Sequence, residues 1–387
     1  MKKGALIFLL CLLISAGFGC QKSSDSTVKV GLIAELTGDI PAVGTSSKNA
    51  AELAAKEIND AGGITVSGKN YKVELFIQDS AAKPDQAAAA AQKLITQNNV
   101  IAIIGPNASS NAIPASEIAE TSKTVLITPW STNPKTTRNA RTGEPKNYVF
   151  RACFTDVFEG HILGKFAAVN LRVKRAAILF DVASEVLKSQ SELFKNSFEK
   201  NGGTVVAYET YTTGDKDFSA QLTKIKNASP QIVFLPSYYT DVPLQVQQAH
   251  RLGVNVPFLG SDAWSTEELI KMCGGECEGF YFCNHYSPDT KNPATKKFIE
   301  TYTARYGKTP DDVAALTYDA FGLLREAVVK SDRLDRQAVR DSLSRITEYN
   351  GITGEMRFLP GSRDPIKGGV IMQIKNGKFS WFADVNP

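Results

Sequence analysis

The 387-residue sequence contains only three histidines, His161, His250 and His285. None of them lies in an H-E-x-x-H zinc pattern or beside a G-x-S-x-G nucleophile elbow. The phosphate-binding patterns G-x-x-x-x-G-K-[ST] and G-x-G-x-x-G are missing as well. The sequence therefore gives no support to an α/β hydrolase, a zinc enzyme or a nucleotide-binding enzyme. It predicts no catalytic residue, no metal and no cofactor.

A strong excess of one charge is also missing. The chain has 44 Lys and Arg against 40 Asp and Glu, a formal net charge of +4. Removing residues 1–19, whose only charged residues are two lysines, would lower this to +2. So small a net charge argues against nucleic acid as a partner. Beyond the N-terminus, no apolar run has the length of a membrane helix.

The N-terminus resembles a bacterial lipoprotein signal. Two lysines precede an apolar run over residues 5–16, and the small residues of G-F-G-C end at Cys20. In such signals the cysteine becomes the lipidated first residue of the mature chain, although Gly17 stands where leucine is favoured. Ordinary cleavage near Gly19, with an incidental cysteine, is the alternative.

This pattern predicts a signal peptide over residues 1–19 and a polar, lipid-anchored tether over residues 20–27. We expect an exported protein of the periplasm or cell surface, attached to the membrane through the lipid alone and monomeric.

Four cysteines remain for disulfides in that oxidising compartment: Cys153, Cys273, Cys277 and Cys283. Four cysteines allow three pairings. The glycines of C-G-G-E-C favour a bond between Cys273 and Cys277, which leaves Cys153 to pair with Cys283. The spacing lacks the two-residue gap of common zinc knuckles, so a metal site at these cysteines is not expected.

Strand-like and helix-like segments alternate along the chain, which predicts an α/β fold of parallel, doubly wound sheets. The length exceeds one hydrophobic core, so we expect two lobes. No serine- or glycine-rich linker separates them, and short strands near residues 148–153, 279–284 and 354–358 are predicted to connect them as a three-strand hinge. The predicted lobes comprise residues 28–150 with 285–354, and residues 151–284 with 355–387.

Hydroxyl-rich loops follow two short apolar runs of the first lobe. V-I-A-I-I-G-P-N-A-S-S-N-A-I-P begins at Val100 and V-L-I-T-P-W-S-T-N-P at Val125. Loops at the carboxyl ends of parallel strands are where open α/β sheets bind ligands. Hydroxyls next to free backbone N–H groups suit a carboxylate. The candidates are Ser109, Ser110, Ser131 and Thr132, each of which is equally well explained as a helix cap.

The loops of the second lobe carry acids instead: Glu185, Asp241 and Asp262. A zwitterion between the two sets of loops would find donors for its carboxylate in the first lobe and acids for its ammonium group in the second. Tyr238 and Tyr239 lie on opposite sides of an extended segment, so one is free to face the cleft while the other packs. Trp130 is costly to expose in a polar loop, which favours a place in the cleft or at an interface.

At these residues the chain resembles the type I periplasmic binding proteins, the branched-chain amino-acid (leucine/isoleucine/valine) substrate-binding proteins of ABC importers. The resemblance covers residues 28–382. It is carried by K-V-G-L-I-A-E-L-T-G, I-N-D-A-G-G-I, G-P-N-A-S-S, I-T-P-W-S-T-N-P, G-D-K-D-F-S-A-Q-L and F-L-G-S-D. It implies a Venus-flytrap fold that binds a small amino acid between its lobes and delivers it to a permease.

The resemblance also implies roles for single residues. Ser109 and Thr132 would bind the ligand's carboxylate and ammonium through their hydroxyls, and Ser131 would help through its backbone. Tyr238 and Asp262 would close over the ligand from the second lobe, with Asp262 paired to the ammonium.

The sequence departs from the family's pattern at several positions. Asp262 replaces a glutamate, Trp130 a glycine and Glu185 a tyrosine, and an aromatic wall near Val43 is missing. Trp130 must shrink or reshape the side-chain pocket. Ala82 and Ala108 stand where the family has a disulfide.

Relatives of this fold bind amides, urea and aromatic acids, so a sensor or receptor for such a ligand is the alternative. Receptors of that kind carry a membrane helix and a signalling domain after the sensor, whereas this sequence ends at Pro387. We therefore expect a transport protein.

Overall fold

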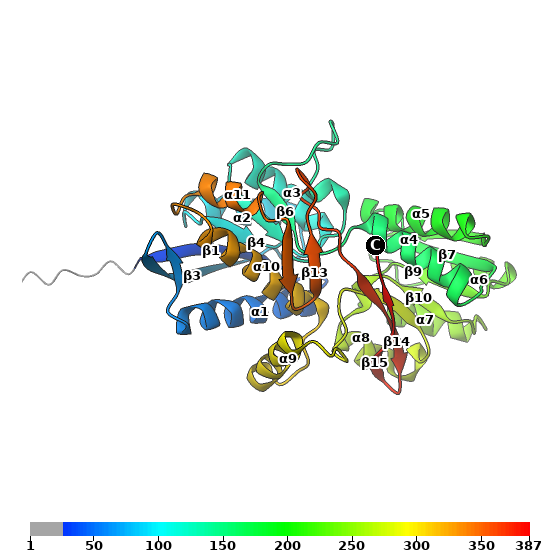
Figure 1. The fold of residues 1–387 in the computed structure, drawn as a ribbon. Helices are drawn as coiled ribbons and strands as arrows, with labels where there is room; N and C mark the ends of the chain where they lie inside the picture. Colours follow the sequence, from blue (N-terminus) through cyan, green and yellow to red (C-terminus); the bar gives the residue numbers. More distant parts are fainter. Residues whose placement is uncertain (1–25) are drawn as a thin grey trace, which may run out of the picture.

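The computed structural model describes residues 26–387, in which strands and helices alternate as predicted (Figure 1). The predicted signal peptide, the lipidation site Cys20 and all but the end of the tether lie outside the described residues. Within residues 26–387, no helix combines the length and the apolar character needed to cross a bilayer.

The first lobe is built on a six-stranded sheet in the order β2-β3-β1-β4-β5-β6. All neighbours are parallel except the β2–β3 hairpin. The strands are β1 (Thr27–Ala34), β2 (Ile64–Val66), β3 (Lys69–Asp79), β4 (Ala102–Ile104), β5 (Val125–Thr128) and β6 (Val149–Arg151).

Helices cover both faces of this sheet, because successive side chains of its strands point to opposite sides. Ile103 packs with α2 (Pro84–Thr96) and α3 (Ser109–Thr121). Its neighbour Ile104 packs on the other face, against the three helices α1 (Pro41–Asp60), α10 (Asp312–Val329) and α11 (Arg336–Leu343). Burial on both faces explains why these strands are continuously apolar.

The second lobe contains a seven-stranded sheet in the order β15-β14-β11-β10-β9-β7-β8. Its first five strands in sequence are parallel, and the C-terminal hairpin β14–β15 adds antiparallel to β11. The strands are β7 (Arg175–Asp181), β8 (Thr204–Tyr211), β9 (Ile232–Leu235), β10 (Phe258–Gly260), β11 (Tyr281–Asn284), β14 (Gly369–Lys375) and β15 (Lys378–Val385).

Helices also cover both faces of the second sheet. One face packs against α4 (Asp156–Lys165), its π-helical continuation η2 (Phe166–Asn170) and α5 (Glu185–Lys200). The other face packs against α6 (Ser219–Asn227), α7 (Val242–Arg251) and α8 (Glu267–Cys273). Three short 3-10 helices, η1 (Pro134–Thr136), η3 (Asp262–Trp264) and η4 (Gly274–Cys277), lie in loops.

The chain passes between the two lobes three times (Figure 1). It leaves the first sheet after β6 and returns after β11, where α9 (Pro293–Tyr306) begins the way back to α1. It leaves again after the small hairpin of β12 (Glu348–Gly351) and β13 (Gly354–Arg357). This order agrees with the three predicted crossings, whereas the residue limits of each lobe stay a prediction.

Some helix limits differ from the sequence-based expectation. The sequence pattern predicts a helix around residues 115–122, whereas α3 begins at Ser109 and contains Pro114. Proline is unfavourable inside a helix because it lacks an N–H donor and crowds the preceding turn, so the pattern pointed to a later start. The pattern likewise predicts a helix over residues 47–61, whereas α1 begins at Pro41, a residue suited to a first helical position. The sequence did not predict α11 or β12, whereas β13 coincides with the short strand predicted near residues 354–358.

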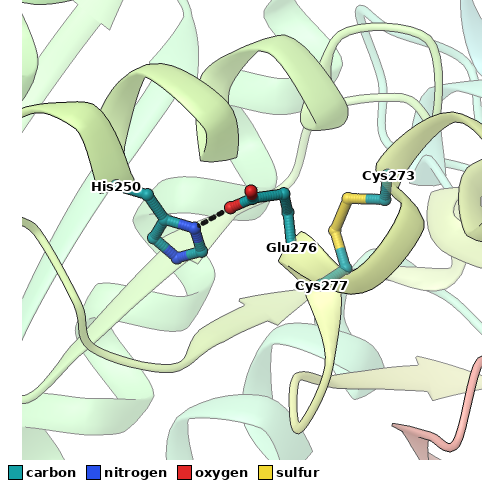
Figure 2. Close-up of a disulfide and its surroundings, with 4 residues drawn as sticks. All are labelled: His250, Cys273, Glu276 and Cys277. Atoms are coloured by element: carbon teal, nitrogen blue, oxygen red, sulfur yellow. Dashed lines mark hydrogen bonds and ion pairs between the residues drawn. A yellow bond between two sulfur atoms is a disulfide. The ribbon is translucent and has the colours of Figure 1, made fainter.

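The predicted disulfide between Cys273 and Cys277 is present, with the two Cα atoms 5.8 Å apart. It closes the turn between α8 and η4, next to the pair of His250 and Glu276 (Figure 2).

The predicted second disulfide, between Cys153 and Cys283, is wrong. Both residues are buried free cysteines, and they belong to different hydrophobic clusters. The Cys153 thiol donates a hydrogen bond to the carbonyl of Ser131, 3.3 Å away. Burial raises the pKa of both thiols, which keeps them protonated.

Candidate functional site

A small cavity of about 20 Å³ lies between the loops of the two lobes. It collects residues from both lobes that are far apart in the sequence. Five of the eight predicted ligand-binding residues line it, namely Ser109, Trp130, Thr132, Tyr238 and Asp262. The other lining residues are Ala108, Val186, Leu187, Gln190 and Ala263.

A larger hollow of about 610 Å³ lies elsewhere on the first lobe. Its lining residues include Lys29 at the start of β1, Val100 just before β4 and Lys123 just before β5. The hollow therefore lies at the amino ends of the parallel strands. Ligands of open α/β sheets bind at the carboxyl ends, and the smaller cavity lies there, so we take the smaller cavity as the candidate site.

The β4–α3 loop gives the site its first hydroxyl, that of Ser109. Gly105 follows β4, and its φ of +85° and close approach to the carbonyl of Ile33 leave no room for a Cβ atom. Ser109 is the first residue of α3, so its N–H group has no partner within the helix. Its hydroxyl oxygen accepts hydrogen bonds from the Ser131 hydroxyl at 3.0 Å and from the N–H of Asn133 at 3.3 Å.

Other donors of this loop are already occupied by Glu35, a fully buried residue that follows β1. Its Oε1 accepts from the N–H groups of Asn107 and Ala108, each at 3.1 Å. Burial raises the pKa of Glu35, and the hydrogen bonds of Asn107 and Asn111 partly offset the shift. The cradle of free N–H groups that the sequence suggested is therefore partly filled by the protein's own carboxyl group.

The β5–η1 loop is held by the buried guanidinium of Arg151 on β6. Arg151 donates from Nη1 to the carbonyl of Ser131 at 2.6 Å and from Nη2 to the carbonyl of Asn133 at 2.7 Å. Its Nε lies 2.7 Å from a carboxylate oxygen of Asp364. The buried, charged side chain of Arg151 thus holds in place the loop that carries Trp130 and Thr132.

The second lobe contributes Asp262, which lies just after β10. Its side chain is almost fully buried, and its backbone N–H donates to Glu159 Oε1 at 2.7 Å. Burial raises the pKa of Asp262 well above its usual value, and Glu159 and Asp312 raise it further. Burial likewise raises the pKa of Glu159, with Asp156 adding to the shift. The site therefore concentrates carboxyl groups away from water.

His285 is the nearest basic side chain to Asp262, with its Nε2 3.1 Å from Asp262 Oδ2. Its ring stacks on Phe154 and is nearly unexposed. Burial lowers the pKa of His285 well below its usual value, and Lys367 lowers it further. The contact is therefore a hydrogen bond of a neutral ring, and His285 brings no positive charge to Asp262.

Asp312, the first residue of α10, reaches the site from the first lobe. Its Oδ2 accepts from Trp130 Nε1 at 2.9 Å, and its Oδ1 accepts from the hydroxyl of Ser265 in the second lobe. Burial raises the pKa of Asp312 to about 8, with Asp311 contributing. One carboxyl group thus joins the tryptophan of the site to the opposite lobe.

Among residues 26–387, one set of side chains has the arrangement of metal ligands, namely Asp262, His285 and Asp312. Their candidate ligand atoms lie within 4.8 Å of one another. The same carboxylates are also suited to the ammonium group of a ligand. Experiments on this site therefore need protein freed of metal.

Three predicted site residues do not line the cavity. Ser110 is exposed on the outer side of α3. The N–H of Ser131 donates to the Thr128 hydroxyl, and its carbonyl binds Arg151, so its backbone groups hold the loop. The side chain of Glu185 is 81% exposed and pairs with Lys135 at 2.5 Å. These three side chains lie outside the cavity lining, and their expected contacts with a ligand stay a prediction.

Several buried residues of the site were missed from the sequence. Gln190 donates to Asp156 at 3.1 Å and to Glu159 at 3.2 Å, bridging two carboxyl groups of α4. Together with His285 and Asp312, these residues are scattered over helices and strand ends without a motif. The one sequence signal for such residues is an acidic side chain on the face of a helix that is predicted to be buried.

The family model for the periplasmic binding proteins matches residues 27–378. The chain belongs to this family. Membership implies an exported, periplasmic solute-binding protein.

Two solved structures and one curated protein illustrate the similarity. The leucine-binding protein of Thermotoga maritima shares 34% identity, with a TM-score of 0.86 over 93% of this chain and 99% of that chain. The branched-chain amino acid transporter substrate-binding protein of Streptococcus pneumoniae, in complex with isoleucine, shares 30% identity and a TM-score of 0.86 over 94% and 100%. A Leu/Ile/Val-binding protein of Rhizobium johnstonii is 31% identical over 90% of this chain and 91% of its own length.

Proposed function

We propose that this protein binds a small aliphatic amino acid between its lobes and delivers it to the permease of an ABC importer. The carrying observation is that the buried carboxyl of Asp262 shares one cavity with the hydroxyls of Ser109 and Thr132. A carboxylate suits the ligand's ammonium, and hydroxyls with the free N–H groups of a helix start suit its carboxylate. The named specificities of the relatives support this proposal.

In this proposal, Tyr238 closes the cavity from the second lobe. The lobes comprise residues 28–150 with 285–354, and residues 151–284 with 355–387. Ligand held by the first lobe gains contacts to the second and shifts the hinge equilibrium toward the closed form. The mature chain begins at Cys20, which carries the lipid anchor, and acts as a monomer.

The excess of buried acid distinguishes an amino acid from the other ligand classes of this fold. An aromatic acid offers only negative charge to Asp262, Glu159 and Asp312. Bringing it into a cavity of low dielectric would cost free energy that no cation returns. Urea and simple amides carry no positive charge that could pair with these carboxyl groups.

Calorimetric titration of EDTA-dialysed protein tests the proposal. We expect binding of aliphatic amino acids and none of benzoate or urea. Asp262→Asn should weaken amino-acid binding by about a hundredfold or more, because truncating a buried, charge-assisted bond typically costs several kcal/mol. Glu185→Gln is the matched control, since that exposed acid lies outside the cavity. An unchanged affinity in Asp262→Asn would contradict the assignment.

A further inference from the structure

The cavity has a polar part and an apolar part. Ser109, Thr132, Gln190 and Asp262 carry its polar atoms, whereas Trp130 and its aliphatic neighbours Val186 and Leu187 supply apolar surface. An amino acid with its charged groups on the polar part must place its side chain against the apolar part. Trp130 is the largest residue there, so its position decides how much space that side chain has.

Trp130 is held firmly in place. The residue is only 5% exposed, and its indole N–H donates to Asp312 Oδ2 at 2.9 Å. Its ring lies 6.5 Å from that of Tyr238, measured between centroids. Turning the indole away would leave a buried donor and a buried acceptor without partners, which is costly.

Asp312 itself cannot follow such a movement. It is fully buried at the first turn of α10, a helix packed on α1 and on the sheet of the first lobe. Its second oxygen is bound by Ser265 of the other lobe. Closing the lobes therefore locks the carboxyl group that fixes the indole.

We propose that Trp130, positioned by Asp312, restricts the ligand to short aliphatic side chains of about the size of alanine to valine and discriminates against leucine. This inference rests on the proposed function and names the substrate class within it. Trp130 touches the ligand, whereas Asp312 acts through Trp130 and is a positioning residue.

Titration calorimetry with glycine, alanine, valine, leucine and phenylalanine tests the ranking. We expect the wild type to bind alanine or valine at least about tenfold more tightly than leucine, as methylene groups alter affinity by roughly ten- to two-hundredfold in a fitted pocket. Trp130→Ala should reverse this order in favour of leucine. Trp130→Leu serves the same purpose if the alanine variant does not fold.

Two further variants separate positioning from lobe closure. Asp312→Ala removes the acceptor that holds the indole and should reduce the ratio of the affinity for alanine to the affinity for leucine. Ser265→Ala removes only the hydrogen bond across the lobes and keeps the bond between Trp130 and Asp312. It should therefore lower the affinity for all amino acids by a similar factor and keep their ranking. A merely structural role of Asp312 would lower the affinities for alanine and leucine by the same factor, and that result would overturn its positioning role.

The two proposals fail in different ways. If the wild type binds leucine as tightly as alanine, or if Trp130→Ala and Trp130→Leu keep the wild-type order, the size limit is refuted while amino-acid binding stands. If the wild type binds no amino acid, the proposed function itself is refuted, and the size limit falls with it.

Discussion

Asp262 lies in a setting that opposes its own ionisation. It is buried together with Glu159 and Asp312, and the neutral ring of His285 adds no positive charge. Each acid raises the pKa of its neighbours because their charges repel at short distance. An ammonium group placed among them would reverse this effect. Binding of an amino acid should therefore displace protons from the site.

This exchange can be measured as proton release. A carboxyl whose pKa is raised holds its proton until the ligand's ammonium lowers that pKa. Binding should therefore tighten as pH rises toward the raised values, about 8 for Glu159 and Asp312, by up to about tenfold per pH unit for one proton. Calorimetry in buffers of different ionisation enthalpy counts the protons. Identical heats in all buffers across this range would contradict the exchange.

At the scale of elements, the site depends on how loops are held at the ends of strands. Arg151 on β6 binds two carbonyls of the β5–η1 loop and also Asp364, which lies between β13 and β14. One side chain thus joins the first lobe's binding loop to a segment that crosses between lobes. Removing it would leave Asp364 and the two carbonyls without their donor.

Arg151→Ala should lower the free energy of unfolding by about 3–5 kcal/mol, the cost of breaking a buried ion pair. Chemical denaturation monitored by circular dichroism measures the change. Arg138→Ala is the control, because Arg138 is half exposed and lies 3.8 Å from the same Asp364 carboxylate. Exposed pairs contribute at most about 1 kcal/mol. Equal losses in both variants would show that burial of Arg151 is not the cause.

At the scale of the whole molecule, carboxyl groups from opposite lobes approach each other in the closed structure. Candidate ligand atoms of Asp312 and Asp262 lie within 4.8 Å of one another. Hydrogen bonds also join the lobes, such as the buried 3.1 Å bond from Asn133 Nδ2 to Asp156 Oδ2 and the 3.3 Å bond from the N–H of Ala42 to the hydroxyl of Tyr239. Lys135 and Glu185 add an exposed ion pair. Repulsion between the acids, once ionised, opposes closure without ligand, so their protonation favours the closed form.

Small-angle X-ray scattering should detect this dependence. A pKa raised in the closed form favours that form at low pH, and the advantage is lost as pH rises through the raised value, about 8 for Asp312. The radius of gyration of the ligand-free protein should therefore increase between about pH 6 and 9, and alanine should reverse the increase. Asp312→Asn should reduce the pH effect. If the radius of gyration of the ligand-free protein stayed constant over this pH range, the predicted dependence would be contradicted.

Much of the fold could be predicted from the sequence. Continuous apolar segments such as Val125–Thr128 are strands because both faces of the sheet are covered, and their order along the chain predicts parallel lobes. The same rule brings Ser109 and Thr132 together at the edge of the first sheet, and Tyr238 and Asp262 together at the edge of the second. That the two pairs face each other was implied only by the resemblance to the periplasmic binding proteins. The disulfide between Cys273 and Cys277 followed from four-residue spacing and two glycines.

Only the tertiary structure decided which groups are already used. Glu35 accepts hydrogen bonds from N–H groups that the sequence left free, and Arg151 binds the carbonyl of Ser131. Cys153 and Cys283 are both free thiols. It also brought His285 and Asp312 to Asp262 and Trp130. Periodicity reports which face of an element is buried, whereas hydrogen bonds between distant segments depend on how the elements meet in space.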